Sequence, residues 1–73
     1  MNNIAKHTNG MSIAELKELL IKLENALAIR KKMLNSALKN SDKFGIEASW
    51  KGIRENMQNI VYLRAKLANA VTA

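Results

Sequence analysis

The stretch SIAELKELLIKLENALAIRKKMLNSALKN, from Ser12 to Asn40, decides the fold of this 73-residue chain. It contains neither Gly nor Pro, and its apolar residues recur in alternating steps of three and four. That spacing is typical of a helix that packs lengthwise against another helix. The residues on this line are Ile13, Leu16, Leu20, Leu23, Leu27, Leu34 and Ala37, with Arg30 as the one interruption. We therefore predict a long helix from about residue 12 to residue 40.

The start of this helix carries a recognisable signal. Ser12 can cap the helix, and Glu15 stands three residues later, which together form a capping box. The other end is marked by the polar residues that follow Lys39 and by Gly45, which predict a turn over about residues 41–45. In this turn Asp42 could cap a following helix, Phe44 is expected to pack over the end of the hairpin, and Gly45 permits a left-handed backbone.

A second helix is predicted from about residue 46 to residue 70. Its apolar line is Ile46, Trp50, Ile53, Met57, Ile60, Leu67 and Val71, interrupted by Arg64. Gly52 within it either marks a frayed first turn or lets another chain approach closely. Two helices joined by a short turn pack antiparallel. The predicted fold is therefore all-α: an antiparallel two-helix hairpin over residues 12–73, preceded by a flexible N-terminal leader over residues 1–11.

The two arginines in the apolar lines suggest contacts across the hairpin. With the turn near residues 42–45, Arg64 falls near Glu24, and Arg30 falls near Glu55. Each arginine would then face an acidic residue of the other helix. The alternative is that both extend their side chains along the edge of the seam to reach solvent.

The composition excludes several classes of protein. There are no cysteines and only one histidine, His7, so neither a disulfide nor a thiolate metal site can form. No nucleophile, base and orienting group can be assembled from the scattered glutamates. We expect no enzyme activity, no cofactor and no metal. The apolar runs are too short for a membrane-spanning helix. The net charge of +6 permits nucleic-acid, acidic-membrane or acidic-protein partners.

Both helices carry apolar residues outside the shared seam. A contiguous exposed apolar patch usually marks an interaction surface, and a hairpin of this length has only a small core of its own. We therefore expect the hairpin to dock on another protein, or to pair with a second copy when alone. The alternative is a third short helix within residues 1–10 that covers the patch. The candidate partner-binding residues are Leu19, Ile21, Ile29, Met33, Trp50, Val61, Tyr62 and Leu63.

Several segments together resemble a known family. The segment from Leu23 to Leu27 (LENAL), Lys31-Lys32, a polar turn, Trp50, and the run from Ile60 to Leu63 (IVYL) are similar to the small E-type co-chaperones of bacterial type III secretion needles. The resemblance implies a cytoplasmic bacterial protein that pairs with a tetratricopeptide-repeat chaperone. Together the two would keep the needle subunit unpolymerised before export. Trp50 and Tyr62 would be its anchors.

Two further readings stay open. Trp50-Lys51-Gly52 is a WxG tripeptide, similar to that of the small secreted WXG proteins of type VII secretion, in which it lies in the hairpin turn. The segment from Tyr62 to Lys66 lacks the acidic residue that this family's export signal places four residues after the tyrosine. The other reading is a small basic nucleic-acid-binding protein, supported by the cluster from Arg30 to Lys32. It is less favoured, because no helix-turn-helix spacing is evident and aromatic residues for base stacking are few.

Overall fold

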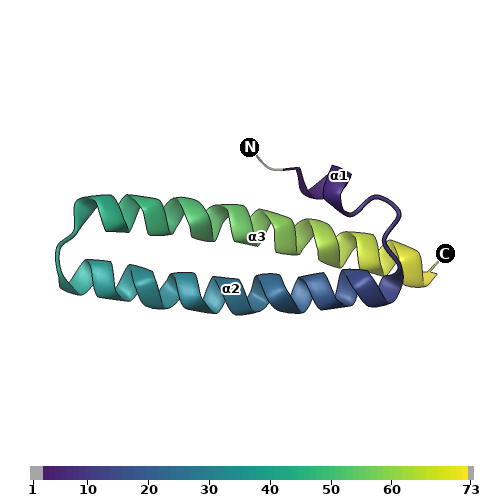
Figure 1. Cartoon of the computed structure of the whole chain (residues 1–73), viewed down its shortest axis with the longest axis horizontal. Helices are drawn as coiled ribbons and strands as arrows, with labels where there is room; N and C mark the ends of the chain where they lie inside the picture. The colour runs from purple at the N-terminus through teal and green to yellow at the C-terminus, as the bar shows by residue number, and fades with distance from the viewer. Residues whose placement is uncertain (1–2, 73) are drawn as a thin grey trace.

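Two long antiparallel helices make up most of the molecule. The structure is a computed structural model and describes residues 3–72. Its helices are α1 (Ile4–His7), α2 (Ile13–Lys39) and α3 (Lys43–Thr72). Helices α2 and α3 lie side by side along a rod with dimensions of 48 × 20 × 15 Å (Figure 1). The predicted all-α hairpin is therefore confirmed.

The beginning of α2 follows the sequence signal. The hydroxyl of Ser12 accepts a hydrogen bond from the backbone N–H of Glu15 at 3.2 Å, and the carboxylate of Glu15 accepts one from the backbone N–H of Ser12 at 3.0 Å. The predicted capping box is confirmed. The backbone N–H of Ser12, followed by its side-chain hydroxyl, lowers the pKa of the Glu15 carboxyl below its ordinary value, because a group that donates to a carboxylate favours the ionised form.

The turn is shorter than predicted, and α3 begins at Lys43 rather than near residue 46. The Asp42 carboxylate accepts a hydrogen bond from the backbone N–H of Gly45 at 3.1 Å, which caps the helix early. The left-handed backbone is found at Ser41, with φ of 52°, and not at Gly45. Gly45 instead permits close packing, since a Cβ there would collide with the Asp42 side chain and lie 3.1 Å from the Cβ of Ala37. Phe44 does not pack over the end and is 87% exposed.

The seam between the helices follows a different line of α3 from the one predicted. On α2 most of the predicted line holds: Leu16, Leu34 and Ala37 are buried and Leu20, Leu23 and Leu27 are half-buried. Its first residue, Ile13, is 41% exposed, contrary to the prediction. On α3, Trp50, Met57 and Val71 were expected inside but are 52%, 52% and 68% exposed. The α3 residues that are buried in steps of four and three are Ser49, Ile53, Asn56, Ile60 and Leu63. Helix α3 is therefore rotated about its axis relative to the prediction.

A hydrogen bond between the helices explains how this rotation is tolerated. The side-chain amide of Asn56, only 6% exposed, donates to the backbone carbonyl of Leu23 at 3.1 Å. A buried amide with a partner avoids most of the cost of leaving water. The rotation also keeps Arg64 at the surface instead of in the seam. The two isoleucines Ile53 and Ile60 belong to both possible lines, so they are buried in either case.

The two arginines behave differently from each other. Arg64 lies 3.6 Å from the carboxylate of Glu24, which confirms that expected contact across the hairpin. Both side chains are largely exposed, so the pair contributes little to stability. Arg30, in contrast, forms no ion pair with Glu55 in the described part of the chain. It lies against Gly52, which is buried inside α3, and a Cβ on Gly52 would collide with the Arg30 guanidinium.

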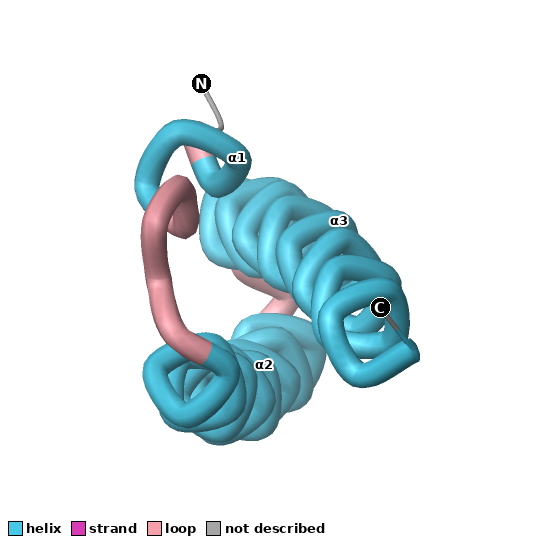
Figure 2. Tube along the Cα trace, turned by 90° about the vertical axis from the view of Figure 1, so that its right-hand side faces the viewer, coloured by secondary structure: helices cyan, strands magenta, loops and turns pink. Residues whose placement is uncertain are grey.

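The N-terminal segment lies against the end of α3. Thr8 is completely buried; its hydroxyl donates to the carbonyl of Ile4 at 2.8 Å and accepts from the Lys66 ammonium at 3.4 Å. Figures 1 and 2 show α1 beside the C-terminal half of α3. A short helix does form within residues 1–10, but it leaves Trp50 and Val61 exposed. The flexibility of the leader stays a prediction.

Candidate protein-binding surface

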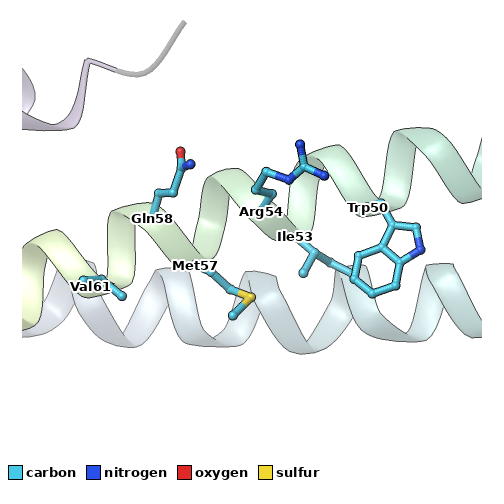
Figure 3. Close-up of a pocket in the computed structure, with 6 residues that line it drawn as sticks. All are labelled: Trp50, Ile53, Arg54, Met57, Gln58 and Val61. Carbon is cyan, nitrogen blue, oxygen red and sulfur yellow. The ribbon is translucent and has the colours of Figure 1, made fainter.

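One side of α3 carries an open apolar groove. It is lined by Trp50, Ile53, Arg54, Met57, Gln58 and Val61 and has a volume of about 500 Å³; we call it the Trp50 groove. Figure 3 shows Trp50 and Met57 extending toward α2, while Arg54 and Gln58 follow the opposite edge. The groove exists because α3 is rotated to bury Asn56 and Leu63, which leaves the large side chains at neighbouring positions outside the seam.

A second, smaller hollow of about 240 Å³ continues the groove across the seam onto α2. It shares Met57 and Val61 with the Trp50 groove and adds Leu27 from α2. Its far end is formed by Glu24 and Arg64, the two members of the surface ion pair. The combined surface therefore has an apolar floor from both helices, begins at Trp50 and ends at a neutralised pair of charges.

The shape of this surface suits a helix. From Trp50 to Val61 the groove follows about three turns of α3, or roughly 16 Å at 1.5 Å per residue. Amphipathic helices dock in such grooves through apolar residues spaced by three and four. The exposed part of Trp50 provides a large aromatic contact of the kind that often dominates protein interfaces.

The predicted partner-binding residues do not form one surface. Only Trp50 and Val61 lie together in the Trp50 groove. Tyr62 is half-buried on the leader side of α3, with the Lys66 ammonium 5.8 Å from its ring centre. Leu63 is fully buried and belongs to the hairpin core, so it presents no surface to a partner.

The four candidates on α2 are also separated from the Trp50 groove. Leu19 is half-buried. Ile21 and Ile29 are each 59% exposed but line neither the Trp50 groove nor its continuation. Met33 borders a different hollow, beside Arg30, Gly45, Ala48 and Ser49. The exposed apolar residues of α2 therefore line neither part of this surface, whereas Trp50, Met57 and Val61 of α3 share one stripe.

Sequence reasoning missed four groove residues. Ile53 and Met57 were assigned to the internal seam, and Arg54 and Gln58 were not singled out. In the continuation of the groove, Leu27 was treated as core alone. A signal was available: the line from Ser49 through Asn56 to Leu63 has the same three-four spacing as the predicted line. Its polar residues made it look less suitable for a core.

Neither a metal-ligand cluster nor a membrane-spanning helix is found in the part of the chain that the structure describes. Within residues 3–72 there is no group of three or more His, Asp or Glu side chains that could hold a metal ion. None of the helices formed by these residues has a stretch long and apolar enough to cross a lipid bilayer. Comparisons with models of known protein families, with curated proteins and with solved structures found no match for this chain.

Proposed function

We propose that this chain is a protein-binding hairpin that docks on a partner through the Trp50 groove. The observation that carries the proposal is the exposure of Trp50, Met57 and Val61 in one stripe, at 52%, 52% and 65%. The chain has a small core, and apolar patches of this kind usually mark interaction surfaces. A partner that covers the stripe removes apolar area from water at about 25 cal/mol per Å².

The specific role follows from the family resemblance. We propose a bacterial co-chaperone of type III secretion that pairs in the cytoplasm with a tetratricopeptide-repeat chaperone and helps to keep the needle subunit unpolymerised. The repeats of such a chaperone are helical and could place a helix along the groove. The hairpin fold agrees with this role, and Trp50 retains its place as an anchor. Tyr62 is the weaker of the two anchors, because it lies on the leader side.

The type VII alternative is less favoured by the position of the tripeptide. Trp50-Lys51-Gly52 lies inside α3, seven residues after its first residue, Lys43, and not in the turn. Gly52 is used for packing against Arg30. Of the tripeptide, only Gly52 therefore lies in the hairpin seam.

The test of the proposal is complex formation with purified components. The chain would be mixed with the tetratricopeptide-repeat chaperone and needle subunit of the same genome and followed by size exclusion with light scattering. We expect a complex with one copy of each protein. The double variant Met57→Ala/Val61→Ala should weaken it. Ile21→Ala/Ile29→Ala is the matched control, since it also removes two exposed apolar side chains.

The outcomes separate the proposal from its competitors. Loss of the complex in the Ile21→Ala/Ile29→Ala variant alone would place the interface on the outer face of α2 and contradict the Trp50 groove. Normal binding by the Met57→Ala/Val61→Ala variant would also contradict the Trp50 groove as the interface. Light scattering of the chain alone over a dilution series, with helicity followed by circular dichroism, reveals whether two copies cover the stripe. Export of the chain itself would support the WXG reading instead.

A further inference from the structure

The basic charge of the rod is concentrated at its turn end. Between Arg30 and Arg54 the chain has seven basic and two acidic residues, an excess of five positive charges. The rest of the chain has five basic and four acidic residues, an excess of one. Because α2 and α3 fold back on each other, the charged segment occupies one end of a molecule 48 Å long. The hairpin therefore has a basic half and a nearly neutral half.

The Trp50 groove runs along this gradient of charge. At its turn end, Trp50 is flanked by Arg54 within the groove and by Lys51 and Glu47 in the adjoining hollow. Within residues 3–72 no carboxylate lies within ion-pair distance of Arg54 or Lys51. At its other end Arg64 is already neutralised by Glu24 at 3.6 Å. The groove thus offers unpaired positive charge beside Trp50 and almost none beyond Val61.

We infer that the partner segment is an amphipathic helix whose acidic residues gather at the end that lies beside Trp50 and the hairpin turn. This inference rests on the proposed function and adds the chemistry and direction of the partner. The apolar face of the partner helix fills the groove, and its acidic side chains face Lys51 and Arg54. Complementary charge of this kind raises the association rate and fixes the orientation of docking.

The charge of the chain argues against a second copy as the occupant. Each copy carries a net charge of +6, so the net charges of two copies repel each other. In a head-to-tail pair the basic end of one copy would face the nearly neutral end of the other and meet no net opposite charge. A phosphate-rich surface would satisfy the basic end but leave the apolar floor formed by Leu27, Met57 and Val61 without a matching contact.

The single tryptophan of the chain makes the inference measurable. Trp50 lies at the turn end of the groove, so its fluorescence reports binding there. The probes are three synthetic amphipathic helices of about 18 residues, or roughly 27 Å, without Trp or Tyr and with the same leucine stripe. One carries Glu at the flanking positions of one half and Gln elsewhere; the second carries only Gln; the third replaces Glu by Lys.

We expect the acidic peptide to bind at least about fivefold more tightly than the Gln peptide at low ionic strength, and the Lys peptide to bind most weakly. The advantage should shrink as salt is added. A quencher on the acidic end of the peptide should reduce Trp50 emission strongly, while the same quencher on the other end should reduce it weakly. The quencher positions test the direction of docking independently of affinity.

A matched pair of variants tests the location of the charge. Lys51→Glu/Arg54→Glu should abolish the preference for the acidic peptide. Lys17→Glu/Lys22→Glu changes the net charge equally but lies in the nearly neutral half, and should keep the preference within about twofold. Circular dichroism at each stage confirms that all variants retain their helices. If both double variants lose the preference for the acidic peptide to the same extent, the inference is overturned, since only the net charge of the chain would then matter.

The remaining outcomes are also decisive. If the Gln peptide binds as tightly as the acidic one, the inference fails while the apolar docking surface stands. If none of the peptides binds, both the inference and the Trp50 groove as a docking surface fail. If phosphatidylglycerol vesicles or a single-stranded RNA change Trp50 emission at lower concentration than the acidic peptide does, the basic end binds phosphate and the inference is overturned.

Discussion

The two sides of α3 that flank its seam differ in how α2 uses them. On one side, which we call the Gly52 side, Gly52 lies against Arg30 of α2, and Gly45 and Ala48 line a hollow together with Arg30 and Met33 of α2. On the other side, the Trp50 side, the larger apolar residues of α3 meet little from α2 beyond Leu27 and stay exposed. Besides Ile53, Ile60 and Leu63, helix α3 thus buries Ser49, Gly52 and Asn56, while Trp50, Met57 and Val61 stay exposed. The difference indicates that maximal burial of apolar side chains is not what sets the rotation of α3.

The largest expected effect comes from the seam itself. Leu63 is fully buried, so Leu63→Ala should lower the free energy of unfolding by about 2–5 kcal/mol. That is comparable with the roughly 3–5 kcal/mol that a core of this size provides. Val61→Ala, two residues earlier and on the Trp50 side, should change it by less than about 0.5 kcal/mol. Urea unfolding followed by circular dichroism measures the free energy of unfolding of both variants. A similar decrease in the two variants would contradict the observed rotation of α3.

A second pair of variants compares the buried amide with an exposed one. Asn56→Asp replaces the donor to the Leu23 carbonyl with a buried carboxylate and should destabilise the hairpin by about 2 kcal/mol or more at neutral pH. Gln58→Glu makes the same chemical change on the edge of the Trp50 groove and should have an effect below about 0.5 kcal/mol. Urea unfolding at neutral pH measures both changes.

The pH dependence of the Asn56→Asp variant provides an internal control. Burial raises the pKa of the introduced carboxyl, and its protonated form can donate to the Leu23 carbonyl again. The variant should therefore regain stability relative to the wild type as the pH falls, the opposite of acid denaturation through paired carboxylates. A loss that persists unchanged at low pH would show that the hydrogen bond of Asn56 is not what holds the seam.

A smaller effect is expected on the Gly52 side. Ala is favoured over Gly in a helix by about 1 kcal/mol, but a Cβ at residue 52 collides with the flexible end of Arg30. We expect Gly52→Ala to be nearly neutral in the wild type and stabilising by about 1 kcal/mol in an Arg30→Ala background. The four variants of this cycle can be compared by thermal unfolding. If Gly52→Ala alone already stabilises the chain by about 1 kcal/mol, the contact between Arg30 and Gly52 makes no difference to stability.

The sequence carried enough information for the hairpin and for α2. The three-four spacing and the Ser12–Glu15 capping box located its seam and its start, because both signals are local and depend on one helix alone. The contact between Arg64 and Glu24 followed from the length of the turn. Helix α3 begins three residues before the predicted start, because Asp42 provides its cap.

The rotation of α3 could not be derived from spacing. Two lines share Ile53 and Ile60, and the one through Trp50 and Met57 is more apolar than the one through Ser49 and Asn56. The choice between them depends on whether Asn56 finds the Leu23 carbonyl, a contact between residues 33 positions apart. The exposed groove is a direct consequence of that choice, so its composition was predicted only in part. The same limit applies to Thr8, whose burial depends on Lys66 at the far end of the chain.

The smallest effect is expected at the Ser12–Glu15 capping box, which lies outside both sides of the seam and serves as a control for the other variants. The pKa of Glu15 is lowered by its hydrogen bonds with Ser12. Its contribution to stability is therefore fully present above the ordinary carboxyl pKa of 4.5 and is lost as the pH falls through the lower value in the folded chain. At pH 7 the wild type should have a higher free energy of unfolding than Glu15→Gln. At pH 3 this difference should be smaller, and unfolding curves at the two pH values measure it. The capping box touches neither Gly52 nor Trp50. The same pH-dependent difference should therefore appear when Glu15→Gln is combined with Gly52→Ala or with Val61→Ala. A different value in either combination would show that the N-terminal end of α2 is coupled to the seam.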